Sequence, residues 1–176
     1  MKIGLTGTMS VGKTTLVNAL QKLPQFKKYK FATERSKYLR DLGIPLNTDS
    51  TLKGQTVFLA ERCAELMHDN VITDRTIIDV MAFTANAQSI NVLDKDKYEQ
   101  YASSFLGEYD YIFYISSEGL PIEDNGVRET NSTYRHLIDV SIQNLLQSYS
   151  HKLKSAHTIN GSTEERIQQI LNVINL

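Results

Sequence analysis

The chain has 176 residues, of which 41% are hydrophobic and 22% are charged, and its formal net charge is −1. This is the size of one globular domain with a sizeable core, and the near-neutral charge argues against a protein whose main task is to coat nucleic acid. The sequence has a single cysteine, Cys63, which excludes an intrachain disulfide, and we expect its thiol to be buried and unreactive. The sequence contains no run of 18 apolar residues, so no membrane span is predicted and we expect a cytoplasmic protein.

Apolar runs predict strands and helices that alternate along the whole chain. Strands are expected over five short apolar or β-branched runs, at residues 2–6, 29–33, 70–74, 110–116 and 156–160. Helical spacing covers the segments at residues 14–22, 34–42, 51–68, 78–87, 94–105 and 132–149, and a last helix follows Ser162, whose capping box with Glu165 marks its start. This order predicts right-handed crossovers and a three-layer α/β/α fold with a five-stranded parallel sheet, in a single domain spanning residues 1–176.

The long helix at residues 51–68 is expected to turn an apolar face towards the core. Its inward side chains are predicted to be Val57, Leu59, Ala60, Cys63, Ala64 and Met67.

The first strand leads directly into the segment from Gly7 to Thr14, which matches the phosphate-binding pattern G-x-x-x-x-G-K-[ST] in full and precedes a helix. Glycines let the backbone N–H groups of such a loop point at the β- and γ-phosphates, at the positive end of the helix. Lys13 adds a charge between these phosphates, and Thr14 offers a hydroxyl to Mg²⁺. The sequence therefore predicts a P-loop NTPase fold in which ATP and Mg²⁺ are bound by Gly7, Ser10, Val11, Gly12, Lys13, Thr14 and Thr15.

Charged residues follow the second and third strands, at the sheet edge where α/β proteins bind their ligands. Asp74 can hold a Mg²⁺-bound water, contact an acceptor or cap the next turn, and Arg75 can hold negative charge on the acceptor or the transferring group. Glu34 can accept the proton of an attacking hydroxyl or favour a helix dipole. Asp79 is expected to pair with Arg75, to face the acceptor or to lie on a helix surface.

These motifs resemble those of the P-loop kinases grouped with the nicotinamide riboside kinase domain of a bifunctional regulator of NAD biosynthesis, a group often described as AAA-type ATPases. The resemblance spans nearly the whole chain. It depends on the run from Gly7 to Leu16, on Thr33-Glu34 and Arg40, on Gln55, on Asp74-Arg75-Thr76 and Asp79, on Asp124, Gly126 and Arg128, and on Ile159-Asn160-Gly161. The pattern also resembles deoxynucleoside and thymidylate kinases.

The resemblance implies further roles for residues outside the loop. Glu34 would bind or activate an acceptor hydroxyl, with Arg75 holding the acceptor near the γ-phosphate. The segment at about residues 118–135 resembles the mobile lid of these kinases, and its Arg128 and Arg135 would close over the phosphates. Asn160 and Gly161 follow the last strand, where related kinases pass the backbone close to adenine; a simple turn is the other interpretation.

The acceptor is expected to lie between the second and third strands, where basic and aromatic side chains gather. The predicted acceptor contacts are Glu34, Arg35, Arg40, Gln55, Arg75 and Asp79, with Lys37, Tyr38, Phe58 and Arg62 nearby. So many cations favour an aromatic base that carries a phosphate over a neutral nucleoside. Lysines also gather at Lys22, Lys27, Lys28 and Lys30, either as a solvated surface or as a patch for DNA.

Three classes of function fit this pattern. The favoured one is a kinase that moves the γ-phosphoryl group of MgATP to a hydroxyl or phosphate of a small nucleoside or nucleotide acceptor, in a monomer or homodimer. A phage-like kinase acting on hydroxymethylated pyrimidines in DNA is the alternative acceptor class. The second class is a P-loop ATPase that works as a switch or motor, although the sequence lacks the guanine-specifying Asn-Lys-x-Asp motif of GTPase switches. The third is a degenerate P-loop protein that binds nucleotide without chemistry, against which the intact Lys13, Thr14 and Asp74 argue.

Overall fold

The computed structural model describes residues 1–33, 35–117 and 132–175. Its strands are β1 (Lys2–Thr6), β2 (Lys30–Ala32), β3 (Val71–Asp74), β4 (Tyr111–Ile115) and β5 (Ala156–Ile159). Its α-helices are α1 (Lys13–Leu20), α2 (Ser36–Asp41), α3 (Leu52–Glu65), α4 (Ile77–Ala85), α5 (Val92–Ala102), α6 (Ser132–Ser148) and α7 (Thr163–Ile174). The predicted alternation is confirmed, with boundaries that move by a few residues.

The five strands form one parallel sheet in the order β2-β3-β1-β4-β5. The central strand β1 pairs with β3 and β4, so that Leu5 lies beside Asp74 and Thr6 beside Tyr114. From β1 the chain moves to the edge strand β2 and then returns through β3 to β4, so the neighbouring strands β1 and β3 form a switch point and the loops after them meet at one edge. In open α/β sheets, such a switch point is where ligands bind.

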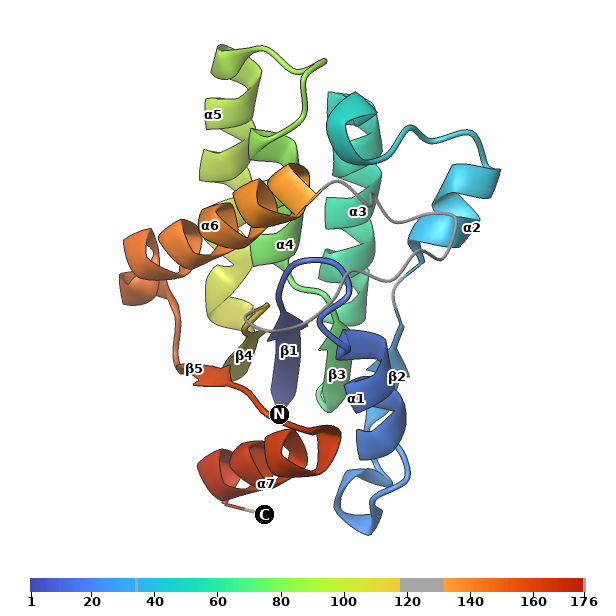
Figure 1. Ribbon diagram of the computed structural model, residues 1–176, viewed down its shortest axis with the longest axis vertical. Helices are drawn as coiled ribbons and strands as arrows, with labels where there is room; N and C mark the ends of the chain where they lie inside the picture. Colours follow the sequence, from blue (N-terminus) through green and yellow to red (C-terminus); the bar gives the residue numbers. More distant parts are fainter. Residues whose placement is uncertain (34, 118–131, 176) are drawn as a thin grey trace.

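Helices cover both faces of the sheet, as Figure 1 shows. One core cluster joins α1 and α7 to one face, and it includes Leu5, Leu16 and Ile170. The other cluster joins α3, α4, α5 and α6 to the opposite face, through Val71 and Ile112 among others. The predicted three-layer α/β/α fold is confirmed. No helix within the described ranges is long and apolar enough to cross a membrane.

The strands send alternate side chains into the two clusters, as the pleat requires. In β4, Ile112 and Tyr114 face one cluster, while Phe113 and Ile115 face the other. Gly4 of β1 breaks this pattern because helix α4 begins directly above it. A Cβ atom at Gly4 would lie 2.4 Å from the Cγ2 atom of Thr76.

The predicted inward face of α3 is right for Leu59, which is buried in the core, and wrong for Ala60, Ala64 and Met67. The buried side of this helix carries Gly54, Gln55, Leu59 and Arg62, whereas Ala60 and Ala64 are exposed and Met67, beyond the helix end, is 83% exposed. The apolar periodicity misled because two polar side chains, Gln55 and Arg62, face the carboxyl end of the sheet. Cys63 is only partly buried, and burial raises the pKa of its thiol.

Candidate functional site

The phosphate loop joins β1 to α1 in a conformation that only particular residues tolerate. Gly7 and Gly12 have φ values of 152° and 82°, and Ser10, at 59°, is also left-handed. A Cβ atom at Gly7 would lie 2.8 Å from the carbonyl oxygen of Ile115, so the loop closes tightly over the end of β4. These glycines allow the backbone amides to gather at the start of α1, where the helix dipole favours an anion.

Lys13 and Thr14 line the cavity beside this loop, at the start of α1. The Nζ atom of the buried Lys13 donates hydrogen bonds to the carbonyl oxygens of Gly7 and Thr8, at 2.6 and 2.7 Å. The hydroxyl of Thr14 donates to Oδ2 of Asp74 at 2.5 Å. The loop after β1 and the end of β3 are therefore joined directly, and this junction brings together the two residues proposed for Mg²⁺ from the sequence.

Asp74 has the chemistry that a Mg²⁺ site needs. Its side chain is fully buried, and its Oδ1 atom has no hydrogen-bond partner among the described residues. A buried carboxylate oxygen without a partner is costly unless a cation or water satisfies it. No cluster of three or more His, Cys, Asp or Glu side chains suits a metal in the described ranges. A Mg²⁺ ion here would be bound by Thr14, Asp74, water and nucleotide phosphates, and in proteins Mg²⁺ is usually bound by few side chains together with water and phosphate oxygens.

Arg75 follows Asp74 in a strained backbone conformation. Its φ is 99°, which a residue with a side chain rarely adopts, and its N–H donates to the carbonyl oxygen of Leu5. The guanidinium lies 5.0 Å from the centroid of the Phe83 ring and 3.5 Å from Oδ1 of Asp79. Strain at such a point is typical of functional sites, and here it turns the side chain into the cavity.

Asp79 pairs with Arg75, as one of its three interpretations predicts, and it is fully buried rather than on a helix surface. Its Oδ2 atom accepts hydrogen bonds from N–H and Oγ1 of Thr76, which completes the capping box of α4. Its Oδ1 atom also accepts from N–H of Gly7 at 3.3 Å. Asp79 thus links the phosphate loop, Arg75 and the start of α4.

Arg135 lies in the first turn of α6, so the predicted lid does not extend to residue 135. The side chain is buried, and its Nε atom donates to the carbonyl oxygen of Met9 at 3.2 Å, while Thr8 donates to the carbonyl oxygen of Arg135. Arg135 therefore anchors the phosphate loop at Thr8 and Met9. Residues 118–131, with Gly126 and Arg128, and Glu34 lie outside the described residues.

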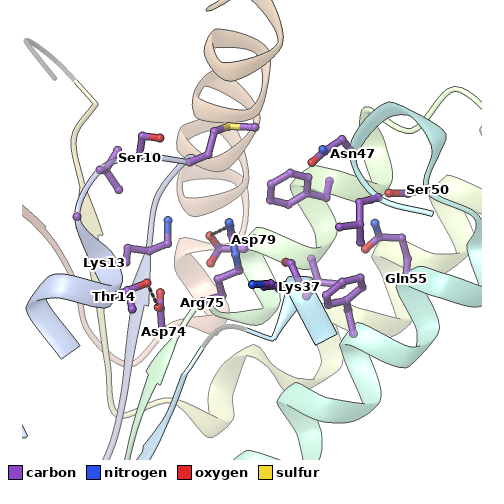
Figure 2. Close-up of a pocket in the computed structure, with 18 residues that line it drawn as sticks. Ser10, Lys13, Thr14, Lys37, Asn47, Ser50, Gln55, Asp74, Arg75 and Asp79 are labelled. Atoms are coloured by element: carbon purple, nitrogen blue, oxygen red, sulfur yellow. Dashed lines mark hydrogen bonds and ion pairs between the residues drawn. The ribbon is translucent and has the colours of Figure 1, made fainter. Parts of the chain in front are cut away.

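A cavity of about 290 Å³ extends from the phosphate loop towards α3 and α4. Figure 2 shows Lys13 and Thr14 on one side, Gln55 and Ser50 on the opposite side, and Arg75 between them. Phe58 and Phe83 add aromatic walls. The sequence predicted Gln55 and Phe58 for this region, but not Ser50 or Phe83. Ser50 comes from a loop, and its buried Oγ atom has no partner among the described residues.

Most of the cations expected around an acceptor do not reach this cavity. Arg62 is buried behind β3, where it donates to the carbonyl oxygen of Asp74 and pairs with Glu65. Arg40 lies beside Asp41, and Arg35 pairs with Glu61 and stacks on a tyrosine ring. Arg35 and Arg40 do not line the cavity, whereas Lys37 of α2 does.

The remaining predicted residues lie apart from the cavity lining. Thr15 is exposed on α1. The side-chain amide of Gln169 accepts a hydrogen bond from the N–H of Asn160 and donates one to its carbonyl oxygen, and Gly161 forms a turn with a φ of 87°. The four lysines are exposed at the amino end of the sheet or before it, opposite the cavity: Lys22, Lys27, Lys28 and Lys30.

One residue behind the loop was not predicted. Arg166, in the first turn of α7, is 6% exposed and donates from Nη1 to the carbonyl oxygen of Val11 at 2.7 Å. Burial lowers the pKa of its guanidinium. A signal was present in the sequence, because Arg166 precedes Ile170 and Ile174 at helical spacing and so occupies a core position of the amphipathic helix.

Comparisons with known proteins agree with this architecture. A family model described as AAA domain matches residues 2–166. No curated protein sequence matches the chain. Among solved structures, deoxyadenosine kinase from M. mycoides with bound dCTP is 18% identical, with a TM-score of 0.70 over 99% of both chains.

Two further solved structures have the same fold. NadR protein in complex with NR is 15% identical, with a TM-score of 0.75 over 99% of this chain and 51% of that one. YorR protein from Bacillus subtilis, in complex with phosphorylated GDP, is 18% identical, with a TM-score of 0.54 over 100% of this chain and 96% of that one. At this identity the likeness shows the fold, and it confirms the expected P-loop architecture.

Proposed function

The chain belongs to the AAA domain family, and from its site we propose that it is an ATP-dependent kinase for a nucleoside-type acceptor. The observation that carries this proposal is the cavity that continues from the phosphate loop to Gln55, Phe58 and Phe83. A phosphate loop alone suits many NTPases. A second, aromatic compartment next to it gives a small acceptor room to reach the γ-phosphate.

The donor half of the proposal depends on the loop. The backbone amides between Gly7 and Thr14 bind the phosphates of ATP, and Lys13 neutralises charge on the transferring group. When bound, Mg²⁺ supplies positive charge to the phosphate oxygens, and Thr14 and Asp74 are the residues that would hold it. The hydrogen bond between Thr14 and Asp74 favours this metal role for Asp74 over a role as general base.

Glu34 is then the proposed base. It follows β2 in the sequence, and β2 pairs with β3, whose last residue is Asp74. A carboxylate there would accept the proton of the acceptor hydroxyl as the phosphorus–oxygen bond to that hydroxyl forms and the bond to ADP breaks. Arg75 would hold the acceptor oxygen near the γ-phosphate, and Arg128 would add charge stabilisation during transfer.

The acceptor is proposed to be a neutral nucleoside rather than a nucleotide. The cavity wall opposite the loop offers the amide of Gln55, the hydroxyl of Ser50 and two phenylalanine rings. An amide donates and accepts at once, which suits the polar edge of a heterocyclic base, and aromatic rings suit its faces. The arginines first expected to bind an acceptor phosphate, Arg35 and Arg40, do not line the cavity. Deoxyadenosine kinase, a protein of the same fold, is named for a nucleoside substrate, and NadR, which also shares the fold, binds NR.

The test is phosphotransfer from γ-labelled ATP to a panel of acceptors. The panel contains deoxynucleosides, nucleoside monophosphates, nicotinamide riboside and duplex DNA with hydroxymethylated pyrimidines. We expect label in one or more nucleosides. Release of ADP with label only in inorganic phosphate, whatever the acceptor, would contradict the kinase proposal and favour an ATPase. Label in DNA would contradict the acceptor class.

A pair of variants assigns the activity to the site. Asp74→Asn should lower kcat by at least about 100-fold, because it weakens metal binding at a position where charge develops. Asp69→Asn removes the same charge from an exposed residue before β3, at the opposite end of the strand, and should leave kcat unchanged. Equal rates in the two variants would rule out the assignment of Asp74.

A further inference from the structure

A buried arginine supports the phosphate loop from the C-terminal helix. Arg166 is 6% exposed, and its Nη1 atom donates to the carbonyl oxygen of Val11 at 2.7 Å. The same Nη1 atom lies 3.2 Å from the point where a Cβ atom of residue 12 would sit, so the guanidinium packs directly against Gly12. More than 150 residues separate the two segments in sequence, and α1 and α7 lie on the same face of the sheet (Figure 1).

The geometry of one peptide unit gives this contact a consequence for ligand binding. The carbonyl of Val11 and the N–H of Gly12 belong to the same planar trans peptide, so they point in opposite directions. Because Arg166 holds the carbonyl from behind the loop, the N–H of Gly12 is turned towards the side that faces the cavity. A cation on the carbonyl also polarises the peptide and makes this N–H a stronger donor.

The charge of Arg166 has no carboxylate beside it in the part of the chain that the structure describes. Burial lowers the pKa of its guanidinium with no contribution from a carboxylate, and its Nε atom is buried without a hydrogen-bond partner among the described residues. The neighbouring acidic residues, Glu164 and Glu165, are exposed, and Glu165 is occupied by the capping box of α7. A buried cation without a counter-ion destabilises a fold. A polyphosphate on the other side of the loop would supply the missing negative charge.

We propose that Arg166 is a positioning residue for polyphosphate: it orients the Val11–Gly12 peptide and contributes a buried positive charge that the bound phosphates compensate. The inference builds on the proposed function only in taking the loop as a phosphate site. It implies that this residue favours ligand affinity over the stability of the protein alone.

The test compares Arg166→Met, Arg166→Lys and a matched control, Lys154→Met. The control removes one positive charge from an exposed side chain that pairs with Asp110 far from the loop. Affinities for Mg-AMP-PNP and for inorganic tripolyphosphate are measured by titration calorimetry, and the melting temperature of each protein is measured without ligand. Tripolyphosphate reports on the loop whether or not the protein is a kinase.

We expect Arg166→Met to weaken the binding of both ligands by about 10- to 100-fold, since it removes a charge-assisted hydrogen bond and a nearby charge. Its melting temperature without ligand should be equal to or above that of the wild type. Arg166→Lys should weaken binding by a smaller factor, and Lys154→Met should stay within about twofold.

Two results would overturn the proposal. One is binding within twofold of the wild type in Arg166→Met, and a lower melting temperature beside it would indicate a merely structural role. If Arg166→Met does not fold, Arg166→Lys decides, and unchanged affinity in that variant is the second. A wild type that binds tripolyphosphate but transfers no phosphoryl group would contradict the proposed function and leave this inference intact.

Discussion

Removal of the Asp79 carboxylate tests whether one buried side chain holds the two halves of the site together. In Asp79→Ala, Thr76 loses the acceptor for its N–H and Oγ1, Gly7 loses an acceptor, and Arg75 loses its ion pair. Asp79 is fully buried and Arg75 is 15% exposed, so water cannot readily replace these contacts. The phosphate loop and the start of α4 should both loosen.

The size of the effect follows from these contacts. The capping box contributes about 1 kcal/mol, and hydrogen bonds to a charged group contribute about 1.5–3 kcal/mol. Arg75 also loses the Asp79 carboxylate, and breaking a buried ion pair of this kind costs about 3–5 kcal/mol in total. For a chain of this length, that lowers the melting temperature by roughly 6–20 °C.

The assay is thermal unfolding followed by circular dichroism, with Glu165→Ala as the matched control. Glu165 occupies the same third position of a capping box, in α7, but it is exposed. The control should lose much less. An Asp79→Ala protein whose melting temperature stays with that of the control would show that burial and the pairing with Arg75 add nothing, and would refute the reasoning.

Three further predictions concern pH, packing and the acceptor. Burial raises the pKa of Glu65 to about 7 from an ordinary value of 4.5, so the folded protein binds the proton of this carboxyl group more tightly than the unfolded chain does. The free energy of unfolding should therefore fall by up to roughly 3 kcal/mol as the pH rises from 4.5 to 7. Denaturant titrations should give a flatter pH dependence for Glu65→Gln, and an identical one would refute the shift. Gly4→Ala should lower the free energy of unfolding by about 1–3 kcal/mol, because its Cβ atom would lie 2.4 Å from a methyl group at the N-cap of α4. Gly107→Ala, whose new Cβ atom would have its nearest contact at an ordinary 3.5 Å, should lower it less. Equal losses of unfolding free energy in chemical denaturation would exclude a packing effect at Gly4. Gln55→Leu should raise the KM for the acceptor about 10-fold or more and leave the KM for ATP unchanged. The control Thr56→Ala, which changes an outward-facing side chain, should alter neither KM. Steady-state kinetics in which each substrate is varied in turn measures both values.

The fold was predictable because its signals are local. Each strand is a short apolar run, the glycines of the phosphate loop fix the first turn, and the capping box at Ser162 marks the start of α7. These features depend on neighbouring residues in the chain, so the sequence alone carries them. The residues at strand ends were found by the same logic, since parallel strands bring their carboxyl ends to one edge.

The contacts between distant segments were harder to predict. The sequence predicts Arg62 in the region of the acceptor, but its place on the buried side of α3 turns it towards Asp74 and Glu65 instead. Arg135 was predicted as the end of a mobile lid, yet α6 starts three residues before it and directs it to Met9. In both cases the type of residue was informative, while its direction depended on how the helix packs, which a single sequence does not encode locally.

The central claim is that one cavity holds a nucleotide donor and a nucleoside acceptor side by side. The most direct test is a crystal structure with Mg-AMP-PNP and the nucleoside that accepts label most efficiently. The account predicts the γ-phosphate at Lys13 and Thr14, and the base between Phe58 and Phe83 with its polar edge at Gln55. A nucleoside bound elsewhere, or a base whose polar edge faces away from Gln55, would contradict it.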